Sequence, residues 1–416
     1  MNVKKLGWIF LVRGGGAALS IILSLLVARL TGVSGAGLYF LAMQVLLVLG
    51  CVSRFGLDNA ILKTISAHSV RGCDRSAKNM LGMSLLVSIF TALFIGGFLA
   101  YFSREIASGF FSKPALDELL SLCALVLVPV VIFNLLSEAL KASGKVASAT
   151  FIQTVCVQFI VVACLLLFGA DGPEIIFQYF FLGCVTAVII ALYRLRNSYS
   201  GGGWYEGYTF KKVWTDSRPL FTIALLNVAM ASCDVIMLGW QSDEIQVGLY
   251  GVANRLSMVG VLLLSVVNGI AGPEFSRLWE LKDASGLRNR LQFYTKWMSV
   301  AATLFLLFFI ICGESLLRFF GPDFMQAEGV LVCLTVGQFI ALSTGPVAYF
   351  LMMTGKDKVH RKATLIAACC NVLLNFYLIP LYGAMGAALA TSISLSCKNI
   401  FSYLYLRREF KVGSYA

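Results

Sequence analysis

The sequence is short of charge and has almost no histidine. Only 13% of its 416 residues are charged and two are histidines, whereas a soluble globular domain has roughly 25% charged residues. Hydrophobic residues make up 59% of the chain. A soluble fold of this size would leave too many of them at its surface. These shortages exclude an ordinary soluble enzyme, a disordered chain and a secreted disulfide scaffold.

Motifs for catalysis and for energy coupling are missing as well. Ser143-Gly144-Lys145 lacks the rest of a Walker A sequence, and neither Cys-x-x-Cys nor His-Glu-x-x-His occurs. Both histidines, His68 and His360, fall in predicted loops, whereas a membrane transferase normally needs a histidine or paired acids facing a cleft. We therefore expect no enzyme, no catalytic residue, no cofactor and no metal site. Cys73 falls in a predicted loop, and the other 11 of the 12 cysteines lie in apolar runs and are interpreted as small, reduced apolar residues.

Long apolar runs dominate the sequence, whose mean hydropathy is +0.84. A helix that crosses a bilayer needs about 20 mostly apolar residues. The sequence therefore predicts an all-α polytopic membrane protein with about 12 transmembrane helices. The apolar runs lie at about 6–29, 36–57, 79–101, 116–140, 147–169, 175–193, 218–240, 247–271, 295–313, 328–352, 363–380 and 384–405.

Basic residues are unevenly divided between the predicted loops. With the N-terminus inside, 25 of the 33 Lys and Arg residues fall in inner segments and 4 in outer segments. The positive-inside rule then places both termini in the cytoplasm. The same bias explains the net charge of +12, so we expect no nucleic-acid partner.

Short motifs recur at about half the chain length, each at an equivalent place among the runs. An even number of spans per half means that both halves enter the membrane from the same side. We predict two parallel six-helix lobes around a central cavity, 1–193 and 218–416, joined by a cytoplasmic linker, 194–217. The matching pairs are Gly37-Leu38-Tyr39 with Gly248-Leu249-Tyr250, Gly144-Lys145 with Gly355-Lys356, and Phe110-Phe111 with Phe319-Phe320.

Ionisable residues within the first four runs are candidates for function, because each costs about 2.5–3.5 kcal/mol at the centre of a span. Arg13 lies about two turns into the first run, where the alternative is that it snorkels to the interface. Arg54 and Asp58 are i,i+4 neighbours that are able to pair. Glu138 shares a helical stripe with Lys141 near the end of the fourth run. Ion pairs at the interface remain the alternative for both stripes.

Further candidates lie in the second half. Asp234 in the seventh run and Arg255 in the eighth belong to helices joined by a short loop, so an Asp–Arg pair inside the bilayer is predicted. A buried pair that fixes helix register is the structural alternative. Amides in these helices either line a cavity or act as packing contacts. They are Asn254, Asn268, Gln338, Asn371 and Asn375.

Two stretches carry a family resemblance. Both resemble signatures of polysaccharide flippases. The first is Asp234 followed by Val247-Gly248-Leu249-Tyr250-x-x-Ala253-x-Arg255-Leu256. The second is Gly355-Lys356 followed by Asn371, Asn375 and Ile379-Pro380-x-x-Gly383-x-x-Gly386-Ala387-Ala388-x-Ala390-Thr391. Gly56-Leu57-Asp58-Asn59 resembles the end of their second helix. The chain is therefore similar to Wzx-type O-antigen repeat-unit translocases of the multidrug/oligosaccharidyl-lipid/polysaccharide exporter superfamily.

The resemblance implies transport of an undecaprenyl-diphosphate-linked oligosaccharide, such as an O-antigen repeat unit, between the leaflets of the bacterial inner membrane by alternating access. Arg13, Arg54 and Arg255 would bind the diphosphate, and the amides Asn254, Asn268, Gln338, Asn371 and Asn375 the sugars. Asp58, Glu138 and Asp234 would couple transport to H⁺ or Na⁺. The expected partners are the lipid-linked glycan, membrane lipid, a polysaccharide polymerase and chain-length proteins, with the chain itself monomeric.

Two other functions stay open at this point. A cation-coupled multidrug exporter of the same superfamily has the same helix count, but it would favour acidic cavities over several arginines. A non-transporting scaffold for polysaccharide assembly fits the hydropathy, but it leaves the charges inside the membrane unexplained.

Overall fold

A computed structural model describes residues 3–70, 74–196 and 210–409. Every regular element in these ranges is a helix, and ten segments are long and apolar enough to span a membrane. Contacts divide the chain into two compact units, Met1–Ile236 and Met237–Ala416. The lobe boundaries predicted from the repeat stay a prediction.

The first unit contains the helices up to most of α9. Its first helix, α1, is broken by a left-handed residue at Gly32, where φ is 69°, so it covers two predicted spans. The elements are α1 (Val3–Arg54), α2 (Leu57–Val70), α3 (Asp74–Tyr101), α4 (Ser103–Glu105), the π-helix η1 (Ile106–Phe110), α5 (Leu116–Ala142), α6 (Val146–Phe151), the π-helix η2 (Ile152–Cys156), α7 (Val157–Phe168), α8 (Pro173–Leu195) and α9 (Phe210–Gln241).

The second unit is built in a similar way and ends in a long broken helix. Gly383, with φ at 54°, divides α15 into two spans. Dividing α1 and α15 at these glycines turns ten long segments into about 12 spans, as predicted. The elements are α10 (Glu244–Ser257), α11 (Val259–Glu280), α12 (Ala284–Phe320), the 3₁₀-helix η3 (Pro322–Ala327), α13 (Glu328–Ser343), α14 (Val347–Met353) and α15 (Asp357–Glu409).

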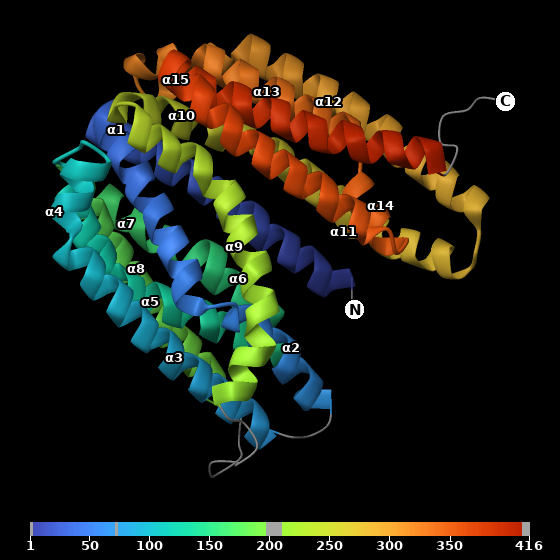
Figure 1. Cartoon of the computed structure of the whole chain (residues 1–416), viewed down its shortest axis with the longest axis horizontal. Coiled ribbons are helices and arrows are strands. Elements are labelled where there is room, and N and C mark those ends of the chain that lie inside the picture. Colours follow the sequence, from blue (N-terminus) through green and yellow to red (C-terminus); the bar gives the residue numbers. More distant parts are fainter. Residues whose placement is uncertain (1–2, 71–73, 197–209, 410–416) are drawn as a thin grey trace. The chain divides into compact units, whose positions relative to one another are not determined.

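Each unit packs around one central helix. In the first unit α5 lies between α3 and α8 and also packs on α1 and α2 (Figure 1). Its side chains at Leu119, Cys123, Leu127 and Val131 are fully buried. In the second unit α13 lies between α12 and α15 (Figure 1). The helical repeat of apolar residues on α5 therefore makes it a core helix on most of its circumference.

The repeated Gly-Lys motifs have matching environments in the two units. Gly144 follows α5 and Gly355 follows α14, and both adopt left-handed backbone with φ of 80° and 71°. The lysine after each glycine donates its N–H to the carbonyl five residues earlier, Lys145 to Leu140 and Lys356 to Leu351, as in a Schellman helix end. The repeated sequence motif therefore has the same local structure in both units.

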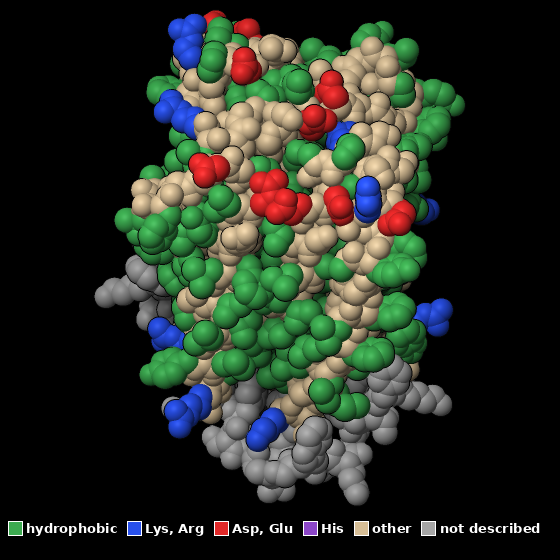
Figure 2. Space-filling model, turned by 90° about the vertical axis from the view of Figure 1, so that its left-hand side faces the viewer, with side chains coloured by type: hydrophobic (Ala, Val, Ile, Leu, Met, Phe, Trp, Pro, Cys, Tyr) green, Lys and Arg blue, Asp and Glu red, His purple; other side chains and the backbone are tan. Residues whose placement is uncertain are grey.

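The paired aromatic residues of the repeat agree in burial. Phe111 and Phe320 are both 4% exposed, whereas their neighbours Phe110 and Phe319 are exposed. Large apolar side chains also cover outer helix faces, for example on α3. Figure 2 shows hydrophobic side chains over a broad part of one face, with acidic side chains gathered towards its upper part. Such a surface suits a membrane, where apolar side chains face lipid.

Candidate functional site

The predicted Arg54–Asp58 ion pair is present at the junction of α1 and α2. Arg54 Nε lies 3.4 Å from Asp58 Oδ2, and the side chains are 16% and 22% exposed. The two helices are separated by Phe55 and Gly56, whose φ angles are 49° and 72°. The pair therefore bridges a break in the helix. Asp58 also accepts from the Asn59 N–H at 2.9 Å.

Helix α9 holds this break in place within the first unit. The Phe55 ring is stacked between Trp214 and Phe221, at centroid distances of 4.4 and 4.2 Å. A Cβ atom on Gly56 would lie 2.4 Å from Phe221 N and 2.8 Å from Ser217 O. Only glycine fits both this backbone angle and this close approach. The position of the ion pair is thus fixed by backbone packing as well as by its own contacts.

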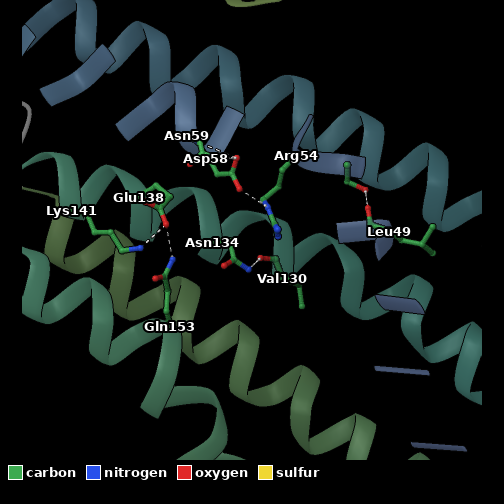
Figure 3. A network of polar contacts seen from close by, with 10 residues as sticks. Leu49, Arg54, Asp58, Asn59, Val130, Asn134, Glu138, Lys141 and Gln153 are labelled. Atoms are coloured by element: carbon green, nitrogen blue, oxygen red, sulfur yellow. Dashed lines mark hydrogen bonds and ion pairs between the residues drawn. The ribbon is translucent and has the colours of Figure 1, made fainter. Parts of the chain in front are cut away.

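A second ion pair lies on the facing helix α5. Glu138 Oε1 is 2.6 Å from Lys141 Nζ and accepts a hydrogen bond from Gln153 Nε2 at 3.0 Å. Asn134, one turn earlier, donates to the Val130 carbonyl at 2.8 Å. Figure 3 shows Asn134 between the Arg54–Asp58 pair and the Glu138–Lys141 pair. Two half-buried ion pairs therefore lie along one end of α1, α2 and α5.

Gly50 brings the guanidinium group close to α5. A Cβ atom on Gly50 would lie 3.6 Å from Arg54 Nη1 and 3.8 Å from Val130 Cγ1. Arg54 Nε is buried and makes no hydrogen bond within the described residues, although Asp58 lies beside it. The buried Nε therefore faces Asp58, and a planar guanidinium fork of this kind suits phosphate oxygens.

The predicted amides of the second unit lie on several helices. Asn371 and Asn375 are buried on α15, where Asn375 Nδ2 donates to Asn371 Oδ1 at 3.2 Å. The Asn268 Oδ1 atom is buried and has no protein partner in the described part of the chain. Asn268, on α11, is half-buried as a whole residue. The other predicted site residues of this unit are half-buried as well, namely Asn254 and Arg255 on α10 and Gln338 on α13.

Tyr250 connects α10 with the second half of α15. Its hydroxyl lies 3.3 Å from Thr391 Oγ1, and its ring is fully buried. Gln246 Oε1 accepts from the Ala384 N–H at 2.9 Å, directly after the break at Gly383. Both contacts join residues of the two stretches that carry the family resemblance.

Arg13 and Asp234 lie in the first unit. Arg13 is exposed on α1, and Asp234 is buried on α9. Next to Asp234, Ser232 donates to Gln44 Oε1 on α1 at 3.0 Å. Arg255 belongs to the second unit. The predicted Asp234–Arg255 pair would join the two units, so it stays a prediction.

Some contacts were not predicted from the sequence. Gln153 is the partner of Glu138, although nothing in the spacing of the two residues indicates it. In the second unit, Glu274 on α11 binds two residues of α12, Arg290 at 2.9 Å and the Tyr294 hydroxyl at 2.6 Å. The sequence signal for the Glu274–Arg290 pair is that the two residues lie on either side of the short turn between two helices.

Comparisons with known proteins agree on one family. A family model described as polysaccharide biosynthesis protein matches residues 2–279, about two thirds of the chain. The probable flippase AglR of Haloferax volcanii is 29% identical over 43% of this chain and 38% of its own length. The probable low-salt glycan biosynthesis flippase Agl15 of the same organism is 23% identical over 96% of this chain and 82% of its own length. The matched part thus spans well under half of AglR.

Solved structures share the fold. An inward-facing multidrug resistance MATE transporter of the MOP superfamily has a TM-score of 0.74 at 15% identity, covering 96% of both chains. The lipid II flippase MurJ, in an inward closed conformation, has a TM-score of 0.73 at 18% identity, covering 97% of this chain and 87% of its own. The predicted all-helical, two-lobed architecture is confirmed. The relatives are named as flippases and transporters and not as enzymes, in agreement with the prediction.

Proposed function

This chain belongs to the polysaccharide biosynthesis protein family, and from that membership we propose that it is a flippase for lipid-linked oligosaccharides. Its cargo is a short glycan, such as an O-antigen repeat unit, on an undecaprenyl diphosphate carrier. The protein moves this cargo from the cytoplasmic to the periplasmic leaflet of the bacterial inner membrane by alternating access. Relatives named as flippases support the proposal, as does the likeness of fold to MurJ.

The observation that carries the proposal is the half-buried Arg54 beside Asp58. A diphosphate headgroup needs fixed cations. Arginine presents a charged, planar guanidinium group whose N–H groups donate hydrogen bonds to two phosphate oxygens. Arg13 and Arg255 are the other cations assigned to this headgroup. The amides assigned to hydrogen bonds with the sugars are Asn254, Asn268, Gln338, Asn371 and Asn375.

Acidic groups beside these cations are assigned to ion coupling. Asp58 neutralises Arg54, and Glu138 neutralises Lys141, so each carboxylate competes with an incoming phosphate for its cation. Protonation or Na⁺ binding at Asp58 or Glu138 would release the neighbouring cation for the cargo, and Asp234 is assigned the same coupling role. Conversion of each acid to its amide tests this role, and an amide variant with full transport and unchanged ion dependence removes that residue from the proposal.

The alternative within the same superfamily is a cation-coupled multidrug exporter, which the likeness of fold to the MATE transporter supports. A cationic drug would be repelled by an arginine released from its carboxylate, whereas an anionic carrier would be attracted. The half-buried Arg54, which protonation of Asp58 would free in this proposal, therefore favours the glycolipid.

Deletion of the gene tests the proposal directly. We expect carrier-linked oligosaccharide to accumulate in the inner leaflet and surface glycan to be lost, with both restored by the wild-type gene. Arg54→Gln and Arg255→Ala should fail to restore export at normal protein levels. Arg104→Gln, which replaces an exposed arginine on α4, is the matched control. Normal surface glycan with heightened drug sensitivity would contradict the proposal and favour the exporter.

A further inference from the structure

A groove of about 640 Å³ lies on the first unit, between α6 and α8. Its walls are apolar side chains, mainly Phe151 and Ile152 on one side and Ile189 and Ile190 on the other. Phe151 and Ile189 are 42% and 61% exposed, so the groove opens on an outer face of the unit. None of these residues belongs to the site assigned to the cargo.

The groove lies beside a local change of helix type. The start of α7 is in close contact with the middle of α8, because a Cβ atom on Gly183 would lie 3.1 Å from Val157. The π-helix η2, Ile152–Cys156, separates α7 from α6 along the chain. A π-helical turn bends a helix. The groove lies between α6 and α8, directly beside this π-helical segment.

The end of the groove carries positive charge. Arg194 lines it and is exposed, next to the exposed Tyr193. Lys145 Nζ donates to the Arg194 carbonyl at 2.7 Å, which brings a second cation to the same end. The apolar walls on α8 lie within about two helical turns of these cations. Tyrosine and basic side chains at the end of an apolar surface are typical of the headgroup level of a membrane.

We propose that this groove is a binding site for one anionic phospholipid. One acyl chain lies between Phe151 and Ile189, and the phosphate of the headgroup accepts hydrogen bonds from Arg194. The charge of the groove end selects an anionic headgroup, because each basic residue close to an anionic lipid contributes about 1 kcal/mol. The occupant is a structural lipid of the bilayer and not the transported glycolipid. The proposal therefore does not depend on the transport function.

Native mass spectrometry and thermal melting of the purified full-length protein test this site. The probes are phosphatidylglycerol and phosphatidylcholine with identical acyl chains, and undecaprenyl phosphate. We expect phosphatidylglycerol to bind more tightly and to raise the melting temperature more. Arg194→Gln should weaken phosphatidylglycerol binding about five-fold, which corresponds to about 1 kcal/mol. Arg104→Gln, which removes an exposed arginine elsewhere on the same unit, should leave binding unchanged.

A second pair of variants tests the apolar walls. Ala147 lines the groove, so the larger side chain in Ala147→Trp should fill it and abolish binding of phosphatidylglycerol. Leu192→Trp, at an exposed position of α8 outside the groove, is the control. Equal affinity for both phospholipids, or unchanged binding by both Arg194→Gln and Ala147→Trp, would overturn the proposal. Tighter binding of undecaprenyl phosphate than of phosphatidylglycerol would overturn it as well, because the occupant would then be the carrier lipid.

Discussion

Replacement of Gly56 by alanine tests the packing that holds the Arg54–Asp58 pair. Gly56 has φ at 72°, and a Cβ atom added to it would lie 2.4 Å from Phe221 N. The left-handed backbone costs a residue with a side chain about 1–2 kcal/mol. The overlap with backbone atoms of α9 adds about 1–3 kcal/mol. We therefore expect Gly56→Ala to destabilise the protein by about 2–5 kcal/mol, and to impair transport because Asp58 moves.

Two glycines of the same unit separate these contributions. Gly144 has φ at 80°, but a Cβ atom added to it would meet no heavy atom within 4 Å, so Gly144→Ala carries only the backbone cost. Gly97 lies within α3, also with open space, and Gly97→Ala should be neutral or stabilising by up to about 1 kcal/mol.

Thermal unfolding of the purified variants in one detergent provides the comparison. The expected order of melting temperatures, from highest to lowest, is Gly97→Ala, then Gly144→Ala, then Gly56→Ala, with the last lowered on the order of 10 °C. If Gly56→Ala melts together with Gly144→Ala, then α9 does not lie against Gly56, and the reasoning about this junction is refuted.

Two further predictions concern single contacts. Gln153→Leu removes a hydrogen bond to the Glu138 carboxylate, and a hydrogen bond to a charged partner contributes about 1.5–3 kcal/mol. The melting temperature of this variant should therefore fall. An unchanged melting temperature would contradict the contact. Asp283 caps the start of α12, and hydrogen bonds from the Gly286 N–H and the Ser285 hydroxyl lower its pKa. A lowered pKa stabilises the folded helix start above the ordinary carboxyl pKa, and this contribution is lost as the pH falls through the lowered value. Hydrogen exchange at the start of α12 should therefore lose protection in acid for the wild type, and Asp283→Asn should weaken that pH dependence.

Features encoded over short stretches of sequence were predictable. The apolar runs indicated the spans, and the Gly-Lys motif of the repeat marks equivalent helix ends at Gly144 and Gly355. The Arg54–Asp58 pair follows from a spacing of four residues, even though the helix breaks between them. These features depend on neighbours in sequence, which is why one sequence was enough.

Features that depend on packing were not predictable. Helix α12 begins at Ala284, well before the predicted span at 295, because its first turns are amphipathic and carry Arg288 and Arg290. The π-helix η2 has no sequence signature of its own, so the groove beside it had no signal. The contact of Gln153 with Glu138 joins two helices, and spacing along the chain says nothing about their register.

The most direct test of the proposed transport is glycolipid translocation by the reconstituted protein. Proteoliposomes would carry a fluorescent undecaprenyl-diphosphate oligosaccharide, with movement between leaflets read by quenching from outside. We predict translocation by the wild type, partial activity for Arg54→Lys because a lysine lacks the planar fork, and none for Arg54→Gln. Translocation by Arg54→Gln at the wild-type rate would contradict the assignment of this guanidinium group to the carrier diphosphate.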